Sequence, residues 1–171
     1  MERAAKGAES GKRRGRKAAA KDAIALLKAD HRQVEDWFEQ YQKARSEDRK
    51  GKLAAQICQA LKIHTTIEEE IFYPAFLEAT DDTDKHHEAE VEHAGAKKLI
   101  AEIEDMSAGD DYYDAKVKVL SEMIKHHVKE EEKPGGMFAE ARKSDMDLDA
   151  LGEQLKARKD QLEGSAGPLD A

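Results

Sequence analysis

The chain has 171 residues, of which 39% are hydrophobic and 39% are charged, with only three prolines. This composition favours amphipathic helices over a sheet protein, and the length suits one domain with a sizeable core. No apolar run approaches the roughly 20 residues that a membrane span requires, and no apolar segment follows the basic N-terminus as in a signal peptide. We therefore expect a soluble, cytoplasmic protein that does not contact a membrane.

The cysteine content and the numbers of histidines and acidic residues limit which side chains can bind a metal. Cys58 is the only cysteine, which excludes an internal disulfide and a thiolate metal cluster. Any bound metal must therefore be held by imidazole and carboxylate groups. The seven histidines and 37 acidic residues supply these groups in number.

Positive charge is concentrated at the N-terminus. Residues 1–21 carry eight Lys or Arg and two Glu, about +6, so the other 150 residues carry about −14 of the total formal charge of −8. Residues 1–20 show no apolar periodicity, and we expect them to form a disordered basic tail. Such a tail either binds nucleic acid or another polyanion weakly through its charge, or is simply solvated.

Four stretches of the chain repeat apolar residues at steps of three and four, the spacing of a helix that buries one face. A fifth stretch of leucines lies near the C-terminus. The predicted helices run from a cap at Asp22 to about Ala44, from about Leu53 to Pro74, from about Lys85 to Met106, from a cap at Asp111 to Pro134, and from about Leu148 to Leu162. We therefore predict an all-α fold, an up-down-up-down four-helix bundle in residues 21–138 with an extra C-terminal helix and a frayed end in residues 139–171.

Each predicted bundle helix carries one histidine on its apolar stripe: His31, His64, His93 and His127. In an up-down-up-down arrangement these residues lie about six to nine positions from the same end of the bundle, a depth of about 9 to 14 Å. The four imidazoles are therefore predicted to share one layer. A single histidine of this kind is most simply a core residue hydrogen-bonded to a neighbour, but four at one height require another explanation.

Two glutamates accompany this layer. Glu68 and Glu131 follow His64 and His127 by four residues, which places each carboxylate one helical turn from an imidazole on the same face. Burying an unpaired carboxylate is costly, and a cation removes this cost. Imidazole and carboxylate ligands without thiolate suit Fe, Mn or Zn better than Ca or Mg. Four histidines and two glutamates exceed the needs of one tetrahedral ion, so two ions are predicted.

Four short motifs on the chain match those of a known protein family and occur in the same order as in that family. They are Asp30-His31, the segment HTTIEEEIFYP from His64 to Pro74, Glu92-His93, and the segment HVKEEE from His127 to Glu132. Over about residues 23–138 the chain resembles the hemerythrin family, also called HHE cation-binding domains. The resemblance implies a non-haem di-iron site with an oxo or hydroxo bridge, in which the four histidines are terminal ligands and Glu68 and Glu131 are bridges. Mn and Zn are the alternative metals.

The third helix departs from the oxygen carriers of this family, which have a second histidine four residues before the position of His93. Ala89 occupies that position here. Glu90, three residues before His93 and on nearly the same face, is predicted to supply a carboxylate ligand instead, with His86 as the weaker candidate. We otherwise expect three histidines at the surface, namely His86, His87 and His126.

The fourth helix departs from the carriers as well, because they have an aspartate five residues after the histidine. Here Glu131 lies four residues and Glu132 five residues after His127, and the sequence leaves open which of them faces the site. A shell with fewer imidazoles and more carboxylates is expected to be more open and to favour ferric iron. This argues against reversible O2 carriage.

These features predict a di-iron protein that binds O2, hydrogen peroxide or NO, for oxygen or redox sensing or for iron handling. The alternatives are an enzyme that decomposes hydrogen peroxide or oxidises iron at the same site, and a metal-dependent interaction protein that presents its basic tail to a partner. Tyr73 either donates a hydrogen bond to bound oxygen or is a plain core residue. The metal, the physiological ligand and the choice between monomer and dimer are left open.

Overall fold

Seven α-helices and one π-helical segment make up most of residues 21–167, the part of the chain that the computed structural model describes. Residues 21–167 contain no strand, so the predicted all-α fold is confirmed. The elements are α1 (Ala23–Lys43), α2 (Glu47–Ile67), the π-helical segment η1 (Glu68–Phe72), α3 (Tyr73–Thr80), α4 (Thr83–Glu104), α5 (Tyr113–Glu132), α6 (Met137–Lys143) and α7 (Leu148–Ala166). The tail predicted for residues 1–20 lies outside the described residues.

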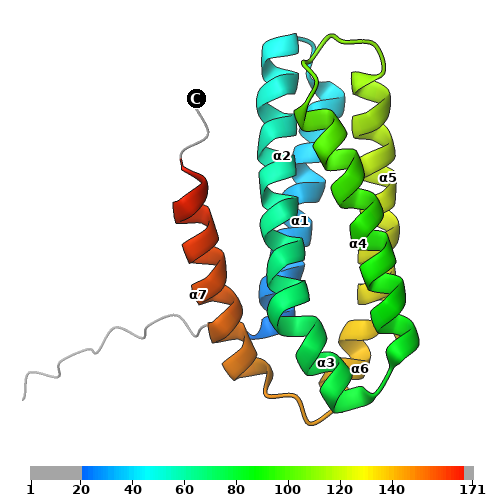
Figure 1. Cartoon of the computed structure of the whole chain (residues 1–171), viewed down its shortest axis with the longest axis vertical. Helices are drawn as coiled ribbons and strands as arrows, with labels where there is room; N and C mark the ends of the chain where they lie inside the picture. The colour runs from blue at the N-terminus through cyan, green and yellow to red at the C-terminus, as the bar shows by residue number, and fades with distance from the viewer. Residues whose placement is uncertain (1–20, 168–171) are drawn as a thin grey trace, which may run out of the picture.

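The four long helices α1, α2, α4 and α5 run alongside one another, and successive ones point in opposite directions (Figure 1). Contacts join α1 to α2, α2 to α4, α4 to α5 and α5 back to α1, which closes a ring around a common interior. The short helices α3 and α6 lie together at one end, and α7 packs outside against α1, α2 and η1 (Figure 1). Within residues 21–167, no helix has the length and apolar character needed to cross a membrane.

Side-chain caps fix the starting points of four helices. In each case a side-chain oxygen accepts a hydrogen bond from the backbone N–H three residues later, which satisfies a donor that the helix itself leaves unpaired. The capping residues are Asp22, Ser46, Asp82 and Asp147. Helix α5 differs, because its N-cap is Tyr112 rather than the predicted Asp111 and makes no side-chain hydrogen bond.

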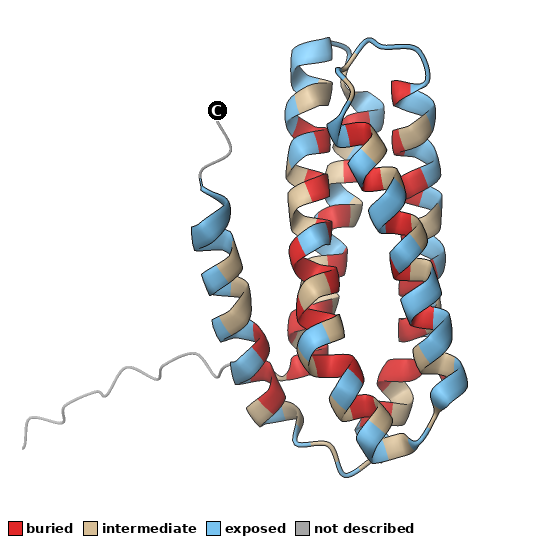
Figure 2. Cartoon of the chain, in the orientation of Figure 1, coloured by how far each residue is buried: buried red, intermediate tan, exposed pale blue. Residues whose placement is uncertain are grey.

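The histidine layer lies between two apolar clusters. On α1, His31 follows Leu27 of one cluster and precedes Val34 of the other. The first cluster lies at the α3 and α6 end and includes Phe76 and Phe138, and the second fills the rest of the interior. Buried residues accordingly follow the inward faces of the long helices (Figure 2). Polar groups in the layer between the clusters are therefore shielded from water on both sides.

The C-terminal part contains one helix that the sequence does not predict. This helix is α6, and the predicted boundary at residue 138 falls inside it. Phe138 stacks on the ring of His31, with 5.8 Å between the ring centroids and 9° between the planes. Helix α7 follows and approaches the start of α1 closely, because a Cβ atom on Gly152 would lie 2.5 Å from the carbonyl oxygen of Lys21. Only glycine permits this contact without a shift of the backbone.

Candidate metal centre

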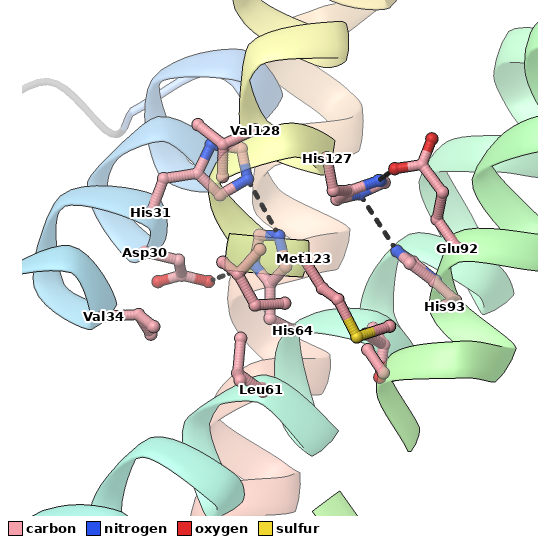
Figure 3. Close-up of a pocket in the computed structure, with 13 residues that line it drawn as sticks. Asp30, His31, Val34, Leu61, His64, Glu92, His93, Met123, His127 and Val128 are labelled. Carbon is pink, nitrogen blue, oxygen red and sulfur yellow. Dashed lines mark hydrogen bonds and ion pairs between the residues drawn. The ribbon is translucent and has the colours of Figure 1, made fainter. Parts of the chain in front are cut away.

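Four buried histidines meet in the interior as two facing pairs (Figure 3). His31 of α1 faces His64 of α2, with 3.1 Å between their Nε2 atoms. His93 of α4 faces His127 of α5, with 3.2 Å between the same atoms. None of the four residues is more than 6% exposed. Each pair therefore directs two nitrogen atoms at one small volume from which water is excluded.

Glu68 and Glu131 lie between the two pairs. The Oε1 atom of Glu68 is 2.9 Å from Nε2 of His64 and 3.4 Å from Nε2 of His93. The Oε1 atom of Glu131 is 3.1 Å from Nε2 of His127 and 3.4 Å from Nε2 of His31. Each carboxylate thus contacts one histidine of each pair. This is the position that a carboxylate bridge between two ions requires.

The buried carboxylates have few hydrogen-bond donors. Within residues 21–167, both side-chain oxygens of Glu68 and the Oε1 atom of Glu131 lack a hydrogen-bond partner apart from the imidazoles that they contact, although these residues are only 0% and 2% exposed. Burial opposes the ionisation of Glu68, but His64 and His93 outweigh it and hold its pKa well below the usual value. Ionised carboxylate oxygens without hydrogen-bond partners are costly to bury at this depth unless a cation binds them.

The candidate ligand atoms divide into two groups. His31, His64 and Glu131 form the first, and Glu68, His93 and His127 form the second; within each group the ligand atoms lie within 4.8 Å of one another. Imidazole nitrogen and carboxylate oxygen without thiolate suit Fe, Mn or Zn. The residues present therefore fit a pair of transition-metal ions.

A further set of carboxylates accepts hydrogen bonds from the Nδ1 atoms of the imidazoles. The Nδ1 atom of His64 donates to Asp30 at 3.1 Å, and that of His127 donates to Glu92 at 3.0 Å. Asp30 precedes His31 and Glu92 precedes His93 in the sequence, so each of these helices braces the histidine of its neighbour. A proton held on Nδ1 leaves the Nε2 lone pair free to bind a metal.

The two glutamates at the end of α5 take different positions. Glu131 points into the centre, whereas Glu132 lies at its outer side and accepts a hydrogen bond from Nδ1 of His31 at 2.8 Å. Of the two glutamates that the sequence leaves as alternatives, the structure brings only Glu131 to the inner layer. His93 is the exception among the histidines, because its Nδ1 atom lacks a hydrogen-bond partner within residues 21–167 and the nearby carboxylate of Glu69 is 3.8 Å away.

Tyr73 also reaches the centre. Its hydroxyl oxygen lies 3.0 Å from Nε2 of His93, 3.3 Å from Nε2 of His127 and 3.2 Å from Oε2 of Glu131. In an α-helix, Tyr73 would be turned about 140° from Glu68, five residues earlier. The segment η1 contains a wider turn, in which the N–H of Tyr73 donates to the carbonyl oxygen of Glu68. This turn brings both side chains toward the same interior.

The phenol of Tyr73 is protonated in the metal-free protein. Burial, together with the nearby carboxylates of Glu131 and Glu68, raises its pKa well above the usual value. Its hydroxyl can therefore donate a hydrogen bond to a carboxylate or to an oxygen atom that enters the centre. A phenol that loses its proton to a metal is also an iron ligand in its own right.

Glu90 does not join the centre. Its side chain is 53% exposed, and within residues 21–167 the basic side chain found within 4.0 Å of its carboxylate is that of His86, at 3.7 Å. The inward stripe of α4 runs through Ala89, His93 and Ala96, which are all buried, and Glu90 is turned from Ala89 by about 100°. The structure therefore does not support Glu90 as a ligand, and Ala89 supplies no donor in its place.

The other three histidines lie outside both ligand groups. His87 and His126 are exposed, as predicted. His86 is more buried than predicted, with a side chain that is 15% exposed. Its ring stands edge-on to that of Tyr73, with 6.2 Å between the centroids and 78° between the planes. His86 therefore packs behind Tyr73 and does not face the centre.

A small apolar cavity adjoins the four imidazoles (Figure 3). Its volume is about 20 Å³, and Val34, Leu61, Met123, Ile124 and Val128 contribute to its wall. A cavity of this size accommodates about one water-sized molecule. The cavity therefore admits a ligand about the size of one water molecule, and an extended organic substrate does not fit.

Comparisons with known proteins bear on this geometry. The family model named Hemerythrin HHE cation binding domain matches residues 22–134. The chain is also similar to the crystal structure of a Hemerythrin HHE cation binding domain-containing protein from Mycobacterium kansasii, an Rv2633c homolog, with a TM-score of 0.71, 26% identity, and coverage of 85% of this chain and 90% of that chain. No curated protein matches the chain. The resemblance in the motifs is therefore confirmed, and the chain belongs to the hemerythrin family of HHE cation-binding domains.

Proposed function

We propose that the chain holds two iron ions between its histidine pairs and binds O2, hydrogen peroxide or NO there, for oxygen or redox sensing or for iron handling. The observation that carries this proposal is the position of Glu68 and Glu131. Each carboxylate contacts one histidine of each pair, and each has at least one oxygen atom that, apart from these imidazoles, has no hydrogen-bond partner within residues 21–167. Two ions that share both carboxylates account for this arrangement, and manganese or zinc fits the same donors.

The surrounding residues prepare the centre for a small oxidant. Asp30 and Glu92 keep two imidazoles in orientation through their Nδ1 atoms. The apolar cavity limits the size of the ligand and excludes bulk water. Tyr73 places a hydroxyl beside the second histidine pair, where it can donate a hydrogen bond. Bound iron would supply one-electron redox chemistry and an open coordination position.

A second candidate function, the decomposition of hydrogen peroxide, is favoured by Tyr73. Cleavage of the O–O bond leaves an oxygen atom that must gain a proton, and a positioned donor accelerates such a step. The Tyr73 hydroxyl lies within 3.3 Å of two candidate ligand nitrogens and one carboxylate oxygen. A proton donor is thus already present at the place where peroxide would react.

Peroxide turnover is expected to depend on His127 and not on its neighbour in the sequence. His127→Ala removes an imidazole from the centre, and oxygen evolution from peroxide by the iron-loaded protein should fall to the level of free iron. His126→Ala removes an exposed imidazole from the same helix and should retain the wild-type rate. An oxygen electrode measures both rates, and iron content is determined on the same samples.

The outcomes separate the two functions. Anaerobic protein loaded with Fe²⁺ should develop a charge-transfer band in the visible or near-ultraviolet region after exposure to air. Wild-type protein that retains no iron and shows no band would refute the binding proposal. A charge-transfer band without oxygen evolution above the rate of free iron would reject peroxide decomposition and would still support the binding function.

A further inference from the structure

Helix α7 lies outside the segment 22–134 that the family model matches, yet it contacts the groups behind the histidines. The Nζ atom of Lys159 is 2.5 Å from Oδ1 of Asp30. The other oxygen of Asp30, Oδ2, accepts the hydrogen bond from Nδ1 of His64. An ammonium group on α7 is therefore linked through a single carboxylate to a histidine of the candidate metal centre.

The position of Lys159 is fixed by the docking of α7. Gly152 and Leu155 are buried, and Gly152 allows the close approach to the start of α1. The neighbouring residue Arg158 donates from two of its nitrogens to the carboxylate of Glu70, at 2.8 and 3.1 Å. Glu70 belongs to η1, which also carries Glu68. Two consecutive residues of α7 thus contact two of the segments that bear candidate ligands, α1 and η1, and the side chain of Lys159 is only 29% exposed.

The second histidine pair differs in this respect. Lys97 contacts Glu69, but Glu69 lies 3.8 Å from Nδ1 of His93, so within residues 21–167 no lysine contacts a carboxylate that is hydrogen-bonded to this pair. Glu92 is the counterpart of Asp30, but within residues 21–167 its only charged partner closer than 4.0 Å is His127. On the first pair, by contrast, both supporting carboxylates have a cation, because Glu132 contacts Arg32 as Asp30 contacts Lys159. The Arg32 side chain is largely exposed, so water screens its charge more than that of Lys159. The two halves of the centre therefore differ in charge.

We propose that Lys159 is a positioning residue which acts through Asp30 and lowers the donor strength of His64, so that the two metal positions become unequal. A carboxylate on Nδ1 increases the electron donation of an imidazole to a metal and thereby favours the more highly charged ion. The ammonium group of Lys159 offsets part of the Asp30 charge and weakens this effect. The inference rests on the proposed two-iron centre and concerns how α7 sets the preference of that centre for ferrous or ferric iron.

The test is the midpoint potential of the iron-loaded full chain, measured by spectroelectrochemical titration. Lys159→Met removes the charge and keeps the length of the side chain, which should shift the potential to more negative values because ferric iron is then favoured. Asp30→Asn removes the negative charge and retains an acceptor for His64, so it should shift the potential in the opposite direction. Lys159→Arg should restore the wild-type value.

Lys156→Met is the matched control. Lys156 lies on the same helix, but within residues 21–167 it pairs only with Asp160, and its side chain is 66% exposed, so its loss should leave the potential unchanged. A role in docking alone would change the unfolding temperature of the metal-free protein without producing shifts of opposite sign. The inference is overturned if Lys159→Met leaves the potential at the control value, or if it shifts the potential in the same direction as Asp30→Asn.

The failure of this inference can be distinguished from the failure of the proposed function. Wild-type protein that retains no iron refutes the two-iron centre, and the role of Lys159 falls with it. Protein that retains two irons per chain, with a potential that is insensitive to Lys159, overturns the role of Lys159 alone. The iron content is measured on each sample before the titration.

Discussion

Replacing Glu68 and Glu131 together by glutamine is expected to abolish the binding of two iron ions and to leave the helical fold intact. Each carboxylate contacts both histidine pairs, so the double variant loses the negative charge that the ions share. We expect the affinity to fall by at least about 100-fold, beyond the effect typical of groups that only support a ligand. Iron per chain after anaerobic loading and gel filtration measures the loss, and far-ultraviolet circular dichroism checks the fold.

Glu90→Gln is the matched control for this experiment. It makes the same chemical change on a carboxylate that the sequence motif suggests as a ligand but that the structure places in solvent. This variant should retain two irons per chain. Two irons bound to the Glu68/Glu131 double variant, or the loss of one iron from Glu90→Gln, would show that the ions are held by other groups.

The affinity for the metal is expected to rise with pH over the range from about pH 6 to pH 9, because binding displaces protons. In the metal-free protein, burial opposes the charge on His64, but Glu68 and Asp30 outweigh it and raise its pKa to about 10. Burial is outweighed by carboxylates in the same way at His31 and His127, and their pKa values are also raised. The raised pKa values favour the protonated imidazoles at neutral pH, and each proton that metal binding releases increases the affinity by about tenfold per pH unit.

Calorimetry with Zn²⁺, which has no redox chemistry, measures this effect directly. The sign follows from the raised pKa values: the metal-free state binds more protons than the metal-bound state, so the affinity must fall as the pH is lowered. Titrations at pH 7 in two buffers of different ionisation enthalpy count the protons, and more than one per chain is expected. Asp30→Asn removes a group that raises the pKa of His64, so this variant should release fewer protons when the metal binds. An affinity that is independent of pH would contradict the prediction.

The long helices could be predicted because their apolar residues recur at the helical period and most of their caps are local. Helix α6 could not, since it has only seven residues and lies between the break at Pro134 and the turn at Ser144. Its burial depends on contacts such as the stacking of Phe138 on His31, which join residues far apart in the sequence. A helix this short has no period to detect, and its stability comes from tertiary packing.

The inner histidines and glutamates could be placed from the sequence because residues four apart on a helix share a face. Tyr73 could not be placed with the same certainty, because the wider turn of η1 changes the angle between residues. Glu90 and Ala89 are a case that sequence spacing alone cannot decide. Spacing puts both near His93, but only the rotation of α4 against its neighbours determines that Ala89 faces inward and Glu90 faces water.

The most direct measurement is anomalous X-ray scattering at the iron absorption edge from a crystal of the iron-loaded protein. Two peaks are expected within each molecule, one beside His31 and His64 and one beside His93 and His127, with the carboxylates of Glu68 and Glu131 between them. A single peak, or an empty centre in a crystal grown from protein supplied with excess iron, would contradict a bridged pair of ions.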